Sequence, residues 1–279
     1  MYRSFIENAP EMPTGYCETR RFTDMLRARY GARVSVLGKT VCGRDIPLLT
    51  LGDGGAERAV IYVASHHATE WICTPLLLLF SRLFLSSRRQ SDTAVFVVPM
   101  LNCDGVELHL HGGGDFSRWQ ANANGVDLNH NYDAGFYEYK KIERRLGITG
   151  GCASRFSGER PESEPETAAL ASFIRSHRGI KGAITLHTQG EEIYCGSPSC
   201  PESVRLGREA ERITGYKLSV PDEEAALYGG MTDYLTEKLR IPSLTVECGK
   251  GRNPLPASAF PGICERVLPL LFSFPDQAP

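Results

Sequence analysis

The sequence has no excess of charge of either sign, because its 279 residues include 31 Lys and Arg against 33 Asp and Glu. A net charge of -2 argues against a nucleic-acid binder or a polybasic membrane-surface protein. Apolar runs such as Pro75 to Phe80 are far shorter than the roughly 20 residues that cross a bilayer, and Arg82 follows that run. Met1 to Pro13 lacks a basic region leading into an apolar stretch, so no secretory signal is predicted and a cytoplasmic location is expected.

Several motifs of other chemistries are missing. No GxGxxG follows an expected strand, no GxxxxGK[ST] phosphate loop is present, and Gly249-Lys250-Gly251 lacks the context of such a loop. No GxSxG elbow occurs, so a serine hydrolase is not predicted. The nine cysteines are odd in number and include no CxxC pair, which argues against a zinc finger or a redox motif. Reduced thiols are therefore expected.

Length and pattern together predict one α/β domain rather than two small ones, because no internal repeat and no linker interrupts residues 1–279. Short β-branched runs alternate with helical patterns, which predicts a central mixed β-sheet flanked by helices on both faces. The expected strands are 46–51, 59–64, 94–99, 182–186 and 243–246, and the expected helices are 17–30, 75–85, 163–176, 201–214 and 230–239. The segment from Asn102 to Gly158 shows neither period and is expected to be a functional loop region.

Three of the expected strands end in residues that can bind a metal or work beside one. Strand 59–64 runs into a segment that contains His67 and Glu70, strand 182–186 ends at His187, and strand 243–246 ends at Glu247. Ligands of open α/β sheets bind beyond the carboxyl ends of the strands, so these residues are expected to converge on one site.

His67 and Glu70 are three residues apart and can face one ion, and His187 would complete a set of two histidines and one glutamate. Such a set leaves one position of a tetrahedral zinc ion open, as catalytic sites do, although cobalt or nickel can replace zinc there. Glu247 could then act as the general base on a water molecule. Each residue alone is more often an exposed helix residue or a packed histidine, and only their combination favours a metal site.

The motifs then point to a known family. The segment His67 to Ile72 resembles the metal-binding motif of the zinc carboxypeptidases related to carboxypeptidase A, Gly125 to Asn129 resembles their substrate loop, and Thr245 to Glu247 their catalytic strand. Gly38 to Ile46 and Ser163 to Glu166 are similar to further stretches of the family. The resemblance implies a single α/β domain over residues 1–279, one zinc ion held by His67, Glu70 and His187, and hydrolysis of peptide or amide bonds promoted by Glu247.

The sequence departs from that family where ordinary members bind the terminal carboxylate of a peptide with arginine. Thr69 and His130 stand at positions that are arginine in many members, Gln120 stands where an arginine commonly helps to polarise the carbonyl, and Asn129 is retained beside His130. Arginine pairs with both carboxylate oxygens, whereas a neutral histidine or glutamine offers a hydrogen bond without a fixed charge. Ordinary trimming of peptide C-termini is therefore not expected.

A second, shorter resemblance is to the bacterial γ-D-glutamyl-diaminopimelate peptidases of the same family. It is carried by Trp119 to Asn122, Gly125 to Asp133, and Glu247 to Pro256. It implies cleavage of the amide bond between the side-chain carboxyl of D-glutamate and a diamino acid in a murein-derived peptide. Because that substrate carries carboxylates, we expect binding by cations, and Arg155, Lys250 and Arg252 are the candidates; each could also be a surface charge.

Two further residues match positions that face the substrate in the family. Tyr228 could lie over the site or simply pack, and Thr232 stands where the family sets its side-chain preference. The alternatives to a murein peptidase are a conventional metallocarboxypeptidase, an N-acyl amino acid deacylase, and a catalytically silent binding protein. Intact metal-ligand and Glu247 positions argue against the last.

Overall fold

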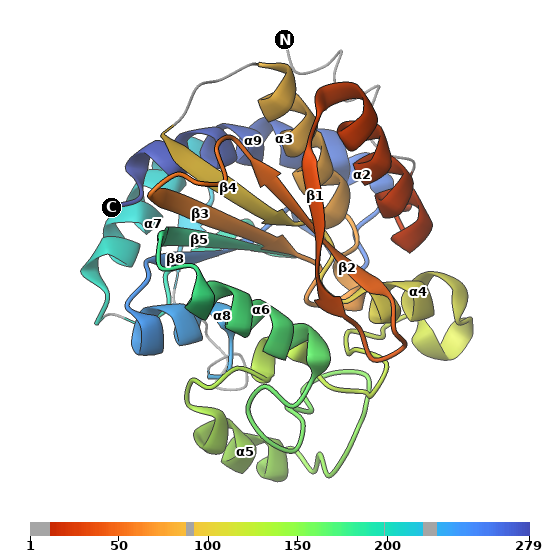
Figure 1. The fold of residues 1–279 in the computed structure, drawn as a ribbon. Helices are drawn as coiled ribbons and strands as arrows, with labels where there is room; N and C mark the ends of the chain where they lie inside the picture. Colours follow the sequence, from red (N-terminus) through yellow and green to blue (C-terminus); the bar gives the residue numbers. More distant parts are fainter. Residues whose placement is uncertain (1–11, 88–91, 198, 220–227) are drawn as a thin grey trace.

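A computed structural model describes residues 12–87, 92–197, 199–219 and 228–279 (Figure 1). Its centre is an eight-stranded sheet in the order β1-β2-β4-β3-β5-β8-β6-β7. The strands are β1 (Arg33–Lys39), β2 (Asp45–Leu51), β3 (Arg58–Ala64), β4 (Thr93–Val98), β5 (Ile180–His187), β6 (Glu192–Tyr194), β7 (Lys217–Leu218) and β8 (Ser243–Glu247). Strands β4, β3, β5 and β8 are parallel neighbours, β1 and β2 pair antiparallel with their neighbours, and β6 is antiparallel to β8 and parallel to β7. The sheet is therefore mixed, as predicted.

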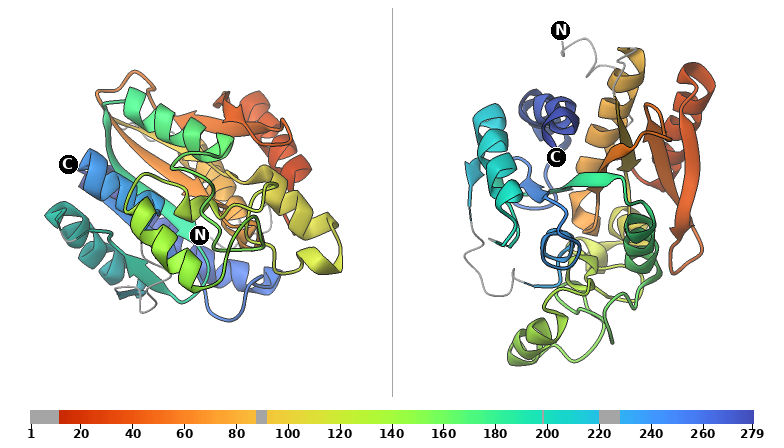
Figure 2. Two further views of the ribbon diagram at one scale, coloured as in Figure 1. Left: turned by 90° about the horizontal axis from the view of Figure 1, so that it is seen from below. Right: turned by 60° about the vertical axis from the view of Figure 1, so that its left-hand side comes forward.

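Helices cover both faces of this sheet (Figures 1 and 2). They are α2 (Tyr16–Tyr30), α3 (Cys73–Ser86), α4 (Cys103–His111), α5 (Phe136–Arg145), α6 (Pro165–Ser176), α7 (Pro201–Thr214), α8 (Met231–Tyr234) and α9 (Phe260–Gln277). In Figure 1, α3 and α9 lie above the strands, while α6 and α8 lie below them. The predicted fold class is thus confirmed.

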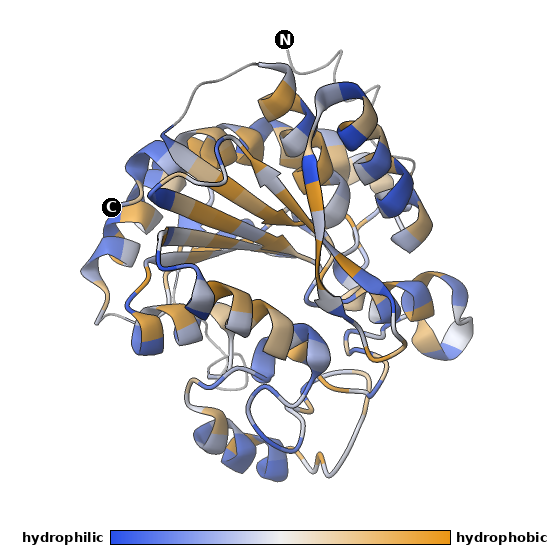
Figure 3. Cartoon of the chain, viewed as in Figure 1, coloured by the Kyte–Doolittle hydropathy of each residue, from blue (hydrophilic) through white to orange (hydrophobic). Residues whose placement is uncertain are grey.

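Alternation along the strands explains the two layers. In β3, Val60 and Tyr62 belong to a hydrophobic cluster with α3, α7 and α9, whereas Ile61 and Val63 belong to a second cluster with α6 and α8. Successive side chains of a strand point to opposite faces, so a strand that is apolar at every position needs a cover on each side. The apolar colouring of the central strands in Figure 3 follows from this double burial.

The largest difference from the sequence prediction lies between Asn102 and Gly158, which was expected to be a loop region. Two helices form there, α4 and α5, separated by turns. Helix α5 buries Phe136, Tyr139 and Ile142 on one face, and beside them Glu143 accepts two bonds from Ser157 outside the helix. The three apolar residues are three positions apart, a helical spacing that the prediction of a loop region did not use.

The register of the parallel strands brings the predicted site residues to one edge of the sheet. Ala64 of β3 pairs with Leu186 of β5, and His187 pairs with Glu247 of β8. The segment that follows β3 therefore lies beside the carboxyl ends of β5 and β8. Over the part of the chain that the structure describes, no helix combines the length and the apolar character needed to cross a membrane.

Candidate active site

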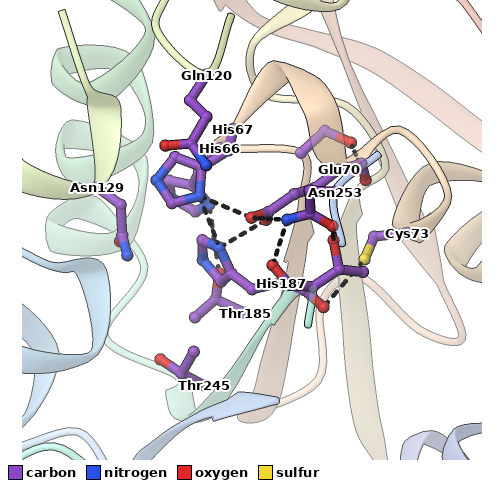
Figure 4. Close-up of polar contacts among 12 residues, drawn as sticks. His66, His67, Glu70, Cys73, Gln120, Asn129, Thr185, His187, Thr245 and Asn253 are labelled. Atoms are coloured by element: carbon purple, nitrogen blue, oxygen red, sulfur yellow. Dashed lines mark hydrogen bonds and ion pairs between the residues drawn. The ribbon is translucent and has the colours of Figure 1, made fainter. Parts of the chain in front are cut away.

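Three side chains from distant parts of the sequence meet at this edge (Figure 4). His67 precedes the 3-10 turn Ala68–Glu70, and His187 ends β5. Nδ1 of His67 lies 3.0 Å from Oε1 of Glu70, and Nδ1 of His187 lies 2.9 Å from Oε2 of the same carboxylate. The two Nδ1 atoms are 3.3 Å apart. These are the residues predicted as metal ligands, and the structure brings all three together.

The donor chemistry of this group fits a zinc ion. Nε2 of His67 lies 3.0 Å from Oδ1 of Asp127 and Nδ1 lies 3.0 Å from Oε1 of Glu70, and a carboxylate can only accept, so without a metal ion both ring nitrogens carry a hydrogen. Asp127 holds the Nε2 hydrogen, so loss of the Nδ1 hydrogen would leave that nitrogen's lone pair for a metal ion. Burial alone would lower the pKa of His67, but the charges of Glu70 and Asp127 outweigh it and raise that pKa well above its usual value. The pocket therefore favours a cation between two nitrogens and a carboxylate, which is a ligand set typical of catalytic zinc.

A second ring of side chains holds the ligands in place. Asn253 donates from Nδ2 to the backbone oxygen of Thr188 at 2.8 Å and to Oε1 of Glu70 at 3.4 Å, and it accepts a bond from the Thr188 hydroxyl at 2.6 Å. The ring of His66 stacks on that of His187 with centroids 5.4 Å apart. Burial and the two neighbouring histidines lower the pKa of His66, so this ring is neutral.

Asp127, Asn253 and His66 were not singled out from the sequence. Asp127 and Asn253 fall inside quoted motifs, and His66 precedes the metal-binding motif directly. Their partners are 60, 65 and 119 residues away in the chain. Residues so far apart in the sequence show no regular spacing, so these contacts could not be predicted from it. The resemblance of the surrounding motifs to the family was the available indication that these residues matter.

Glu247 ends β8 with His187 as its partner on one side and Glu192 of β6 on the other. Burial, together with the negative charges of Glu70 and Glu192, raises the pKa of Glu247 well above its usual value, against the opposing charge of His67. The predicted general base is therefore a half-buried carboxyl next to the metal-binding group.

Gln120 and Asn129 lie on two sides of the His67 segment (Figure 4). The backbone oxygen of Gln120 accepts the Ala68 N–H at 3.0 Å. The backbone N–H of Asn129 donates to Oδ1 of Asp127 at 3.2 Å, the same oxygen that holds His67. Both predicted substrate-binding residues are therefore tied to the metal-binding segment, directly or through one carboxylate.

His130 differs from the sequence expectation. Its ring stacks on Tyr139 with centroids 3.8 Å apart, and its Nδ1 lies 2.9 Å from the backbone oxygen of Tyr228. A carbonyl oxygen only accepts, so Nδ1 must donate. Burial lowers the pKa of His130, against the opposing charge of Asp127, so the ring is neutral and has no second hydrogen to offer. In this tautomer Nε2 can accept but not donate, and substrate binding by His130 stays a prediction.

Tyr228 and Thr232 have contacts that indicate packing. The Tyr228 ring lies so close to Gly135 that a side chain at that glycine would clash. The Thr232 hydroxyl is buried and lies 2.8 Å from that of Thr245, two residues before Glu247. Thr232 thus borders the catalytic strand, whereas no described contact links the Tyr228 side chain to the metal-binding group.

No printed contact joins Lys250 or Arg252 to the metal ligands within the described ranges. Lys250 forms an ion pair with Glu191 at 3.1 Å, and the exposed Arg252 has no hydrogen bond or ion pair within the described ranges. Arg155 donates its backbone N–H to Oδ2 of Asp127 at 3.0 Å. The backbone of Arg155 is thus tied to Asp127, the carboxylate that holds His67.

Comparison with known proteins agrees with this geometry. Residues 19–269 match the family described as zinc carboxypeptidase. The chain is 33% identical over 264 residues to gamma-D-glutamyl-L-diamino acid endopeptidase 1 of Lysinibacillus sphaericus, and the alignment covers 83% of this chain. It covers 64% of that relative, so the chain spans less than two thirds of its length.

Two solved structures share the fold. Bovine thrombin-activatable fibrinolysis inhibitor superimposes with a TM-score of 0.80 at 20% identity, covering 94% of this chain and 96% of that one. Murein-tripeptide amidase from Escherichia coli O157 superimposes with a TM-score of 0.63 at 21% identity, covering 91% and 97%. The family match and the grouping of the three side chains together confirm the predicted zinc cofactor.

Proposed function

The chain belongs to the zinc carboxypeptidase family, and from that premise we propose that it hydrolyses murein-derived peptides at the amide bond between γ-D-glutamate and a diamino acid. One observation carries the choice of substrate. The site keeps a complete metal-binding group, but Thr69, Gln120 and His130 stand where the arginines for a peptide C-terminus would be expected. The relative from Lysinibacillus sphaericus, named for cleavage of a γ-D-glutamyl bond, supports the same substrate class.

The proposed roles follow from the chemistry of each group. When bound by His67, Glu70 and His187, zinc supplies a Lewis acid that polarises a carbonyl and makes water more acidic. Glu247 takes a proton from the attacking water and returns it to the amine that leaves. Gln120 and Asn129 orient the substrate beside His67.

The test is cleavage of L-alanyl-γ-D-glutamyl-meso-diaminopimelate by the zinc-loaded protein, followed by mass spectrometry, with an ordinary L-peptide in parallel. We expect release of diaminopimelate from the murein peptide alone. Trimming of the L-peptide alone would instead identify a conventional carboxypeptidase with a rebuilt carboxylate site. Release of an acyl group from N-acyl amino acids alone would identify a deacylase.

A cytoplasmic location stays a prediction from the sequence. Fractionation of cells that produce the tagged full-length protein, with a cytoplasmic and a secreted marker, measures it directly.

A further inference from the structure

A hollow of about 320 Å³ lies at the end of the sheet that is far from the metal-binding group. It is bordered by the C-terminal end of α6, the beginning of β5 and the turn that leads into β8 (Figure 1). Strand β5 runs from Ile180 to His187. At about 3.3 Å per residue its two ends are roughly 23 Å apart, so the hollow is separate from the site that contains His187.

Basic side chains gather on the lining of this hollow, which we call the α6 hollow. They are Arg175, His177, Arg178, Lys181 and Arg240. Among the described residues that line the hollow, none is aspartate or glutamate. Pro279, the last residue of the sequence, also borders it, and no ion pair of its carboxylate is found in the described part of the chain. The whole sequence has slightly more acidic than basic residues, so this local excess of positive charge does not follow from composition.

The fixed cations of the α6 hollow differ in how far their charges are compensated. Arg175 donates to both carboxylate oxygens of Glu162, at 2.6 and 2.9 Å, so its charge is paired. Arg240 donates to a serine hydroxyl at 2.8 Å, which is a neutral acceptor and leaves the charge uncompensated. Arg178 and Lys181 are exposed, and neither side chain has a hydrogen bond or ion pair with another described residue. Three uncompensated cations therefore border one hollow.

A second basic hollow, of about 800 Å³ beside α7 and the end of α9, is built differently. Two of its three arginines are paired within their own helix: Nε of Arg205 lies 2.7 Å from Glu202, and Nε of Arg212 lies 3.0 Å from Glu209. Most of the positive charge of that surface is thus neutralised by the helix that carries it. The α6 hollow lacks such partners among its lining residues, so its charge is available to a ligand.

Apolar side chains form the base of the α6 hollow. Ile174 and Ile180 are each 2% exposed and belong to the hydrophobic cluster shared with α8. Leu239 and Ile241 pack against that cluster and also line the hollow. Ligand pockets are commonly 300–1,000 Å³ in volume, with apolar walls and a few polar groups that fix the ligand. A hollow of about 320 Å³ with cations at its rim therefore suits a small anion that has an apolar part.

We propose that the α6 hollow binds a small organic phosphate. The phosphate group is held by Arg178, Lys181 and Arg240, and the apolar part of the ligand lies on the base of the hollow. A phosphate monoester carries a charge of about −1.5 to −2 at pH 7 and three strong acceptor oxygens, which suit several cations that are not paired. Arginine offers a planar fork and lysine a point charge, and both bind phosphate. The inference is independent of the proposed function, because the hollow shares no residue with the metal-binding group.

The test measures binding by the zinc-loaded full chain without a C-terminal tag, since such a tag would follow Pro279 at the rim. Isothermal titration calorimetry compares phenyl phosphate with inorganic phosphate and with phthalate, which carries two carboxylates on the same ring. We expect phenyl phosphate to bind at least about fivefold more tightly than inorganic phosphate, because its ring buries apolar surface. Absence of phenyl phosphate binding would overturn the inference. Equal affinity for the two phosphates, or tighter binding of phthalate, would contradict the assigned ligand class.

A double variant locates the bound phosphate. Arg178→Gln combined with Lys181→Gln removes two exposed cations and is expected to weaken phenyl phosphate binding by about tenfold or more. Arg208→Gln combined with Arg212→Gln removes the same charge from α7 and is the matched control, with an expected change of less than about twofold. Similar losses in both variants would indicate an effect of net charge alone. Unchanged affinity in the first variant would place the ligand elsewhere, for example on the zinc ion, and would overturn the inference.

Vesicles distinguish a small ligand from a lipid headgroup that offers the same phosphate chemistry. The protein is sedimented with phosphatidylcholine vesicles, with and without phosphatidic acid. We expect no sedimentation that depends on phosphatidic acid, because the ligand enters a hollow of limited volume. Sedimentation that the Arg178 and Lys181 double variant abolishes, in a protein that does not bind phenyl phosphate, would contradict a small ligand.

Discussion

The ligand atoms of the metal-binding group and the polar atoms of Asn129 and His130 differ in how far they are bonded, although the other ring nitrogen of His187, Nε2, is buried without a partner among the described residues. Glu70 and His187 are 2% and 1% exposed, and bonds from His67, Asn253 and each other surround their ligand atoms. Asn129 and His130, which lie one carboxylate away, each have a polar group without a described partner. The metal ligands are therefore held by bonds within the protein, whereas these two side chains each keep one polar group without a described partner.

Removing the metal from the group formed by His67, Glu70 and His187 has the largest expected effect. Dialysis against a chelator is expected to abolish hydrolysis, and one equivalent of zinc should restore it. The melting temperature should also fall, because an ion that binds only the folded state stabilises it by mass action. Scanning calorimetry measures the melting temperature, and atomic absorption measures the zinc content of each sample. Full activity in metal-free protein would contradict the assignment of the three ligands.

Glu247→Gln separates chemistry from metal binding. The variant keeps the shape of the side chain but cannot take up a proton, so kcat is expected to fall by at least about 10²-fold, the typical contribution of a general acid or base. Its zinc content should match that of the wild type, since Glu247 is a neighbour of His187 and not one of the grouped ligands. Turnover at the wild-type rate would remove Glu247 from the mechanism.

Asp127→Ala tests the carboxylate that accepts hydrogen bonds from both His67 and Asn129. The substitution removes the acceptor that orients His67, so zinc affinity is expected to fall by about 10- to 100-fold, as found for partners of metal-binding histidines. Competition with a chromophoric chelator measures the dissociation constant. Asp127→Asn retains an oxygen that can accept from Nε2, so its loss should be smaller. Equal losses in the two variants would point to a general collapse of the loop, which circular dichroism would detect.

Asn253→Ala is expected to have the smallest effect of the four. It removes two bonds to Thr188, which follows His187, and a long contact of 3.4 Å to Glu70. The zinc dissociation constant should rise by less than about tenfold. Asn124→Ala serves as the matched control, because that side chain bonds Glu164 and none of the metal ligands. A similar change in both variants would deny Asn253 a specific role.

The sequence predicted most of the fold because its signals were local. Strands β2, β3, β4, β5 and β8 are runs of buried apolar residues, and all five were expected at nearly their observed positions. Strand β1 was missed because it is a largely exposed edge strand, and β6 and β7 because they have only three and two residues. Helix α5 lies inside the segment that was expected to be a loop region, although its buried Phe136, Tyr139 and Ile142 have helical spacing.

For the site, the sequence by itself determined which residues can bind a metal and that they stand at the ends of strands. The capacity to bind a metal and the position at a strand end depend on residue type and on short distances along the sequence, such as the three positions between His67 and Glu70. Only the tertiary structure decided that Asp127 orients His67, that Lys250 pairs with Glu191, and that His130 donates its hydrogen to the backbone oxygen of Tyr228. These partners are 59 to 98 positions apart in the sequence, so their contacts depend on how the whole chain folds. For a histidine, such a contact also determines which ring nitrogen carries the hydrogen.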